Sequence, residues 1–247
     1  MSIESPEDWA GMREAGRITR LTLDALEASV RPGVTTGELD AVAAAVFAAH
    51  GARSAPALVY GFPGTVLISV NDEVVHGVPG PRRLKHGDLV KLDVTVEKDG
   101  YVADAARTVV VGNGVEVAHR LAACAVAALE AAMHVAKAGV LVNEIGRAVT
   151  REVRRHGFSV VRGLAGHGVG RTIHEPPTVP NEWNRFQRDV LTEGLVLTIE
   201  PMISAGSAEA RNDSDGWTVR TSDGSLSAHT EHTLVIMKGA PPLVLTA

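Results

Sequence analysis

Two aspartates stand in one expected hairpin at a spacing that would let them share a cation. Asp93 and Asp104 lie in strand-like segments joined by Asp99-Gly100, a dipeptide typical of two-residue hairpin turns. With that turn, Thr95 pairs with Asp104, and Asp93 then lies on the same face. A three-residue loop would place the acids on opposite faces unless a bulge restored parity. Solvated strand acids are the alternative, but apolar neighbours indicate partial burial, and close buried carboxylates cannot both ionise without a cation.

The second half of the chain adds imidazole groups and further carboxylates. His167 and His174 stand seven residues apart in a glycine-rich stretch that we expect to be a loop. Glu200 ends an apolar strand directly before Pro201, and Glu231 lies within another apolar strand. Each of these residues alone could be an ordinary packed or solvated side chain. Together with the hairpin acids they form a hard, oxygen-rich set that suits manganese, iron, cobalt or zinc, and two such ions would activate water for hydrolysis.

Helix and strand patterns alternate along the chain. Capping residues, glycine stops and apolar spacing predict helices at 5–30, 37–50, 116–138 and 143–156. Strand patterns cover 65–71, 89–96, 101–111, 194–202, 217–221 and 226–237. The order predicts two similar α+β halves, about 1–113 and 114–247, that share one sheet. No segment has the composition of an interdomain linker, so we expect a single domain over 1–247.

Composition excludes several classes of function. The chain has 247 residues, 45% of them hydrophobic, with a net charge of −5, which argues against a general binder of nucleic-acid backbones. No apolar run is long enough to span a membrane, and the acidic N-terminus is unlike a signal peptide, so we expect a cytoplasmic protein. The single cysteine, Cys124, excludes an internal disulfide or a thiolate zinc site.

Five short motifs occur in a characteristic order, with eleven residues from Asp93 to Asp104. They are residues 71–79 (NDEVVHGVP), 92–96 (LDVTV), 166–171 (GHGVGR) with 174–177 (HEPP), 198–202 (TIEPM) and 231–233 (EHT). From Trp9 to about Ile236 the chain resembles the bacterial type I methionine aminopeptidases. The resemblance implies an α+β pita-bread fold, in which helices flank an antiparallel curved sheet with pseudo-twofold halves. It also implies removal of the initiator methionine from nascent proteins when the second residue is small.

The resemblance assigns a metal-ligand role to five residues. Asp104 and Glu231 would bridge two divalent ions, Asp93 would chelate one of them, and His167 with Glu200 would complete the coordination of the other. The ions would be cobalt, manganese, iron or zinc, and the sequence does not select among them.

Further residues acquire catalytic and substrate-binding roles from the same resemblance. Glu200 would also accept the proton of the attacking water. His174 would stabilise the tetrahedral oxyanion, and His76 would bind the scissile amide nitrogen or the adjacent carbonyl. The substrate's free amine would complete the coordination of one metal. The methionine pocket would be lined by four apolar residues, Phe62, Leu67, Ile173 and Trp217.

Some positions depart from the commoner family pattern. Leu67 and Val75 stand where cysteines are frequent. Val59 replaces a frequent tyrosine, and Tyr60 directly precedes Gly61. The pair His229-Thr230 replaces a usual glutamine and aromatic residue before the ligand at 231. None of these changes removes an expected ligand, so they bear on pocket polarity and relative substrate rates.

Two other functions compete with this interpretation. An Xaa-Pro aminopeptidase or prolidase has a similar ligand set but usually a large additional N-terminal domain. A non-catalytic pita-bread binding protein would have lost its ligands, whereas all five are present here along with His76 and His174. We therefore expect an active monomeric enzyme whose partner is the N-terminal methionine of nascent peptides, with a transient ribosome contact and no membrane or nucleic-acid function.

Overall fold

The N-terminal half is built around one long hairpin. The computed structural model describes residues 1–247, and in it β4 (Leu89–Lys98) and β5 (Tyr101–Val110) pair antiparallel along their whole length. Asp99 and Gly100 form the turn with φ values of 50° and 84°, the left-handed backbone that this turn requires. The expected register is confirmed, because Thr95 lies opposite Asp104.

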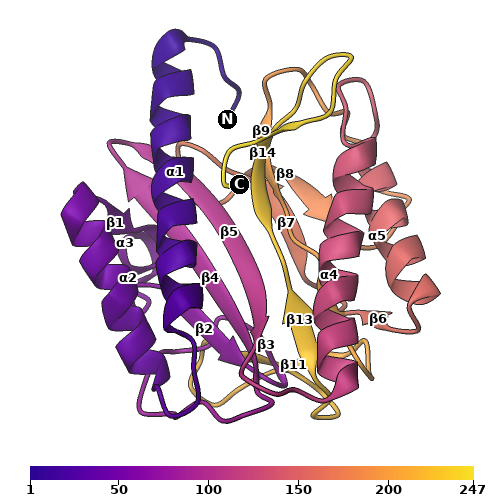
Figure 1. The fold of residues 1–247 in the computed structure, drawn as a ribbon. Helices are drawn as coiled ribbons and strands as arrows, with labels where there is room; N and C mark the ends of the chain where they lie inside the picture. The colour runs from indigo at the N-terminus through magenta and orange to yellow at the C-terminus, as the bar shows by residue number, and fades with distance from the viewer.

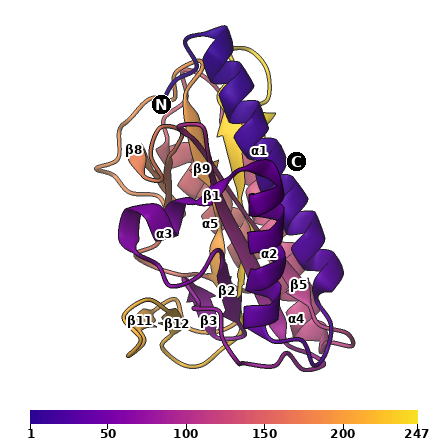
Figure 2. The ribbon, with the colours of Figure 1, turned by 90° about the vertical axis from the view of Figure 1, so that its left-hand side faces the viewer.

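Two helices cover one face of this hairpin. Both α1 (Pro6–Ser29) and α2 (Thr36–His50) begin at the caps that the sequence indicates, Ser5 and the Thr35 capping box. Figure 2 shows them on one side of the strands and α3 (Ala55–Tyr60) on the other. The remaining strands of this half are β1 (Arg53–Ser54), β2 (Leu67–Val70) and β3 (Glu73–Val75).

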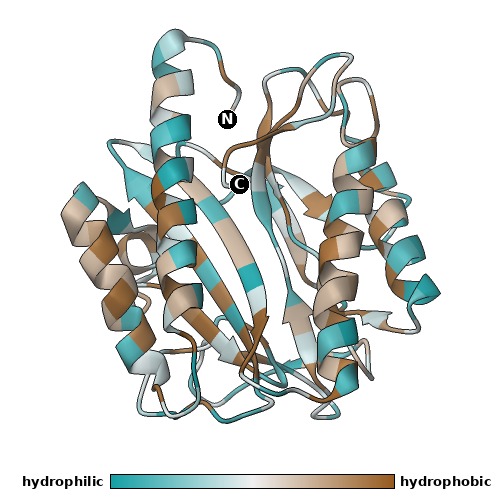
Figure 3. Cartoon of the chain, viewed as in Figure 1, coloured by the Kyte–Doolittle hydropathy of each residue, from teal (hydrophilic) through white to brown (hydrophobic).

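The C-terminal half repeats the arrangement of helices against strands, as Figure 1 shows. Here α4 (Glu116–Val135) and α5 (Asn143–Arg155) pack together and bury the largest apolar core of the molecule. Apolar residues alternate with polar ones on helices and strands in both halves (Figure 3). The strands are β6 (Ser159–Val160), β7 (Ala165–Gly168), β8 (Glu175–Pro180), β9 (Val196–Ile199), β10 (Met202–Ser204), β11 (Ala210–Asn212), β12 (Val219–Thr221), β13 (Ser227–His229), β14 (His232–Val235) and β15 (Leu243–Val244).

The glycine-rich stretch is a strand around His167, which corrects the expected loop there, whereas residues 169–174, which include His174, lie outside the strands. The strand is β7, and it pairs with both β8 and β9. A Cβ on Gly166 would lie 2.6 Å from the carbonyl oxygen of Thr198, so the glycine allows the neighbouring strand to approach closely. Close packing of backbones, and not loop flexibility, accounts for the glycine there.

Two expected long strands are each interrupted at an expected metal ligand. The segment 194–202 divides into β9 and β10 at Glu200-Pro201, where the proline cannot donate to a sheet ladder. The segment 226–237 divides into β13 and β14 at Thr230-Glu231. Glu200 and Glu231 therefore lie between strands, where their side chains need not follow the alternation of a regular strand.

The two halves meet along β5 and β14. The strands form four hydrogen-bonded sheets instead of one shared sheet, and an isolated bridge joins Ala106 to Glu231. Beside it, the Thr233 hydroxyl accepts from the Asp104 amide at 2.8 Å and donates to the Asp104 carbonyl at 2.7 Å. These bonds support the single domain, which stays a prediction. No helix combines the length and the apolar character needed to cross a bilayer.

Candidate active site

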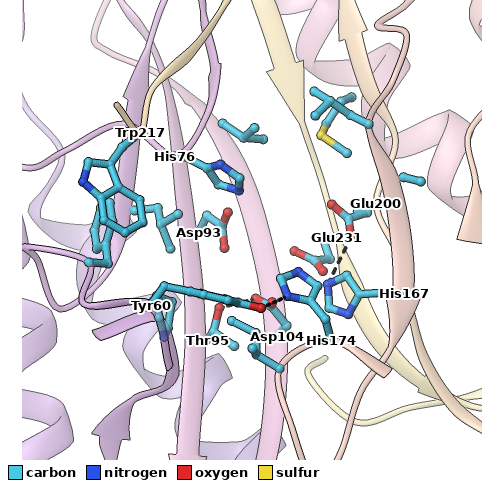
Figure 4. A pocket seen from close by; sticks show the side chains of 18 of the residues that line it. Tyr60, His76, Asp93, Thr95, Asp104, His167, His174, Glu200, Trp217 and Glu231 are labelled. Atoms are coloured by element: carbon cyan, nitrogen blue, oxygen red, sulfur yellow. Dashed lines mark hydrogen bonds and ion pairs between the residues drawn. The ribbon is translucent and has the colours of Figure 1, made fainter. Parts of the chain in front are cut away.

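A cavity of about 490 Å³ opens between the halves and collects residues from both (Figure 4). This volume is suited to a side chain and the backbone next to it. Every expected site residue lines the cavity: Phe62, Leu67, His76, Asp93, Asp104, His167, Ile173, His174, Glu200, Trp217 and Glu231. The structure therefore brings together all the side chains that the sequence singled out.

The hairpin contributes two of the acids to the lining of the cavity. Asp104 is buried, and its Oδ1 accepts a hydrogen bond of 3.0 Å from the Thr95 hydroxyl. Burial raises the pKa of Asp104 to about 6. Burial, with the charges of Asp104 and Glu200 nearby, raises the pKa of Asp93 well above its usual value. In both residues burial disfavours the charged form, which a bound cation would stabilise.

The strand breaks of the C-terminal half add two glutamates opposite the hairpin. Glu200 Oε1 accepts from the Thr198 hydroxyl at 3.0 Å. Glu231 is 2% exposed, and its Oε1 has no hydrogen-bond partner. Burial first, and the neighbouring acids second, raise the pKa of both glutamates well above the usual value. A buried carboxylate oxygen without a partner is costly and calls for a cation.

His167 is oriented to offer a lone pair to the same place. Its Nδ1 lies 2.9 Å from the Gly168 carbonyl oxygen, so Nδ1 carries the proton and Nε2 is free. Nε2 lies 3.4 Å from Glu200 Oε1. Burial lowers the pKa of His167 to about 4, which keeps the ring neutral at physiological pH. A neutral imidazole whose other nitrogen bonds a carbonyl is the usual arrangement of a metal ligand.

The donor set fits divalent metal ions. Ligand atoms of Asp104, His167 and Glu231 lie within 4.8 Å of one another, and the same holds for Glu200, His229 and Glu231. None of the four acids forms an ion pair with lysine or arginine. Carboxylate oxygens with imidazole nitrogen suit the harder transition-metal ions.

A second histidine stands at the mouth of the cavity with a tyrosine partner. The Tyr60 hydroxyl lies 2.5 Å from His174 Nδ1, and the His174 ring lies 4.2 Å from the His167 ring, centre to centre. Tyr60 ends α3, where Gly61 takes a left-handed conformation with φ of 72°. Sequence reasoning did not assign Tyr60 to the site, although its position before a glycine in a short apolar segment was visible.

His76 approaches the cavity from the opposite wall. Its backbone is left-handed, with φ of 60°, a conformation that costs a non-glycine residue free energy. The next amide, of Gly77, donates to the Ser69 hydroxyl at 2.9 Å, and the Thr218 hydroxyl donates to the His76 carbonyl at 3.4 Å. The strained backbone therefore directs the imidazole into the cavity, as Figure 4 shows.

The remaining wall is apolar. Phe62 and Trp217 meet edge to face, 5.2 Å between ring centres. Leu67 and Ile173 are 6% and 5% exposed, and Val75 is buried beside them at the cavity wall. Two of the positions that depart from the family pattern thus keep this wall free of polar atoms.

Comparison with known proteins identifies the family to which the chain belongs. Residues 10–238 match the model of metallopeptidase family M24. The chain belongs to this family. A relative from Bacillus subtilis named methionine aminopeptidase 2 is 41% identical, covering 100% of this chain and 99% of its own. The crystal structure of methionine aminopeptidase from Rickettsia prowazekii superposes with a TM-score of 0.95 at 37% identity, and each chain is covered completely.

Prolidases share the fold but less of the sequence. The prolidase from Pyrococcus furiosus is 23% identical with a TM-score of 0.81, and this chain covers 65% of it. Within family M24, these methionine aminopeptidases are similar to the chain over the full length of both proteins. The expected pita-bread fold is confirmed, and the chain is a metal-dependent aminopeptidase.

One more residue at the site had no assigned role. His229 is 1% exposed, and its Nε2 lies 3.7 Å from Glu200 Oε2 and from Glu231 Oε2. Burial lowers the pKa of His229 to about 3. The sequence marked it only as a departure from the family pattern.

Proposed function

We propose that the chain removes the N-terminal methionine of nascent peptides whose second residue is small, using eleven of the residues that line its cavity. The observation that carries this proposal is the convergence of four carboxylates and one neutral imidazole beside an apolar wall; three of the carboxylates are buried, and Asp93 is half-buried. Polar ligand groups and apolar surface lie side by side there, as recognition of a free amine and a thioether side chain requires. The methionine aminopeptidase relatives support the choice of substrate.

Five residues are proposed to hold two divalent ions. Asp104 and Glu231 would bridge them, Asp93 would chelate one, and His167 with Glu200 would hold the other. The free amine of the substrate would then complete the coordination of one ion. When bound, such ions supply Lewis-acid activation of water and of the scissile carbonyl. Cobalt, manganese, iron and zinc are the candidates.

The chain's own groups move protons and stabilise charge around this centre. Glu200 is proposed to accept the proton of the attacking water, and the Thr198 hydroxyl bond at 3.0 Å fixes the carboxylate for that role. With the Tyr60 hydroxyl donating to Nδ1 of His174, the ring proton lies on Nε2. His174 can then donate from Nε2 to the developing oxyanion.

Two further parts of the cavity are proposed to bind the substrate: the wall that carries His76 and the apolar wall. His76 is proposed to hold the scissile amide nitrogen or the neighbouring carbonyl from its fixed position. Phe62, Leu67, Ile173 and Trp217 are proposed to receive the methionine side chain. Their apolar atoms exclude water from the space beside the reacting bond.

A metal add-back assay tests the proposal. The protein is stripped with chelator, loaded separately with manganese, cobalt, iron or zinc, and assayed on Met-Ala-Ser, Met-Leu-Ser and Ala-Pro-Ala. Metal-dependent cleavage of Met-Ala-Ser well above that of the other two peptides is expected. Cleavage of Ala-Pro-Ala alone would move the chain to the Xaa-Pro aminopeptidase and prolidase side of the family, and no cleavage with any metal would favour the non-catalytic binding protein.

We also propose that the enzyme acts as a monomer in the cytoplasm, in transient contact with the ribosome, because nascent N-termini emerge there. Light scattering of the purified protein tests the monomer. Cosedimentation with ribosomes at low and moderate salt tests the contact, and absence from the ribosome pellet at both salt concentrations would exclude it.

A further inference from the structure

His229 lies behind the metal-binding carboxylates, at the end of β13. It does not line the cavity, and 1% of its surface is exposed. The Thr108 hydroxyl fixes its backbone twice, accepting from the His229 amide at 2.9 Å and donating to its carbonyl at 2.6 Å. Met202 pairs with it across the sheet. The position of this imidazole is therefore determined by the fold and not by solvent.

Neither ring nitrogen of His229 has a hydrogen-bond partner. Glu231 Oε1 is also without one. Most buried polar atoms in native proteins are paired, because leaving one unpaired costs about 1–3 kcal/mol. Several unpaired donors and acceptors in one small volume therefore indicate that a further group normally binds them.

The distances match a shared cation better than a hydrogen bond. His229 Nε2 is 3.7 Å from Glu200 Oε2 and 3.7 Å from Glu231 Oε2, too far for a hydrogen bond to either. Donor atoms held about 2.0–2.2 Å from one ion lie about 3–4 Å apart. Ligand atoms of all three residues lie within 4.8 Å of one another.

We propose that His229 is a sixth protein ligand of the metal centre, binding through Nε2 the ion held by Glu200. This proposal rests on the metal centre of the proposed function. It gives the centre two imidazoles, His167 from the cavity side and His229 from the core side. Imidazole nitrogen favours zinc, iron and related ions, whereas carboxylate oxygen alone suits manganese. The second imidazole is therefore expected to favour zinc and cobalt over manganese.

Counting the ligating histidines tests this without an activity assay. In the cobalt-loaded protein each ligating imidazole contributes one strongly shifted, exchangeable N–H signal to the proton NMR spectrum. Two such signals are expected in the unsubstituted protein and one in His229→Gln. The matched control is His232→Gln, a neighbour in β14 whose ring bonds Thr246 at 2.8 Å, and it is expected to keep both signals.

Titration with zinc and with manganese supplies a second measurement. Zinc affinity is expected to fall at least tenfold in His229→Gln, with a smaller change for manganese and none in His232→Gln. A single shifted signal in the unsubstituted protein would overturn the proposal even if the variant failed to fold. That result would leave the metal centre of five ligands intact, whereas no metal binding at all would overturn both.

Discussion

The molecule contains two clusters of acidic side chains that differ in how their negative charge is balanced. In the first, Arg220 donates to Asp72, Glu73 and Asp213 at 2.9, 2.8 and 2.5 Å, and Arg82 donates to Glu73 at 2.7 Å. In the second, around Asp104 and the cavity glutamates, no lysine or arginine takes part.

The pKa values show the consequence of this difference. Hydrogen bonding to Arg220 lowers the pKa of Asp213, whereas burial raises the pKa of Asp104 to about 6. An acid that the chain neutralises with its own arginine contributes to stability, and an acid left without a countercharge depends on a cation from solution. The arginine cluster is structural, and the cavity cluster is built to bind an ion.

The strongest test of the cavity cluster is Glu200→Ala. The change removes both a proposed metal ligand and the proposed proton acceptor, so hydrolysis of Met-Ala-Ser should fall by about 10³-fold or more. Turnover is measured at saturating metal. Glu209→Ala is the matched control, because that glutamate is exposed and pairs only with Arg162, and it should leave turnover unchanged. Near-normal turnover of Glu200→Ala would remove this residue from the mechanism.

Loss of His174, a neutral neighbour of the cavity acids, should lower turnover less than loss of Glu200. His174→Ala removes the proposed donor to the oxyanion, and turnover should fall by about 10²–10³-fold with metal content unchanged. Metal analysis alongside kinetics separates the two roles. Loss of bound metal in His174→Ala would show instead that the ring supports the metal site, since it lies 4.2 Å from His167.

Much of the cavity cluster could be predicted from the sequence because short-range rules fix it. The Asp99-Gly100 turn alone sets the register that places Asp104 opposite Thr95. The pairing of the β4–β5 hairpin depends on no distant contact, so its two acids could be located from local residues. The motif resemblance supplied the partners from the other half.

Features set by long-range packing could not be predicted. The strand around His167 has a glycine-rich sequence because β9 packs closely against Gly166, and nothing local reveals that approach. Tyr60 reaches the site through α3, whose six residues are too short to give a clear helical pattern. The proposed role of His229 rests on two buried ring nitrogens without hydrogen-bond partners, and their burial depends on the pairing of β13 with β10.

The arginine cluster is tested by Arg220→Gln. The change removes the only arginine that pairs with all three carboxylates and leaves Arg82 paired with Glu73, so we expect a loss of about 2–3 kcal/mol in the free energy of unfolding. Chemical denaturation at pH 7 measures it. Arg162→Gln, which breaks an exposed pair, should cost less than about 1 kcal/mol. Equal losses in the two variants would contradict the structural role of the cluster.

The smallest expected effect is a pH-dependent change in the thermal stability of the metal-free protein. Burial raises the folded pKa of Glu231 above its unfolded value near 4.5, so the folded state binds more protons and this contribution to stability falls as the pH rises above that value. Glu231→Gln replaces the carboxyl with a group that does not titrate. In chelator, the Tm of the variant should match that of the unsubstituted protein near pH 4.5 and exceed it at pH 8, by about 2–4 °C for each kcal/mol.

Added zinc should reverse the order of the two proteins, because a carboxamide is a weaker ligand than a carboxylate and only the unsubstituted protein gains the full binding energy. Thermal unfolding at pH 4.5 and pH 8, with chelator and with zinc, provides the four comparisons. If Glu231→Gln were less stable than the unsubstituted protein in chelator at pH 8, the carboxylate would already have a countercharge within the chain. The contrast between the two acidic clusters would then be wrong.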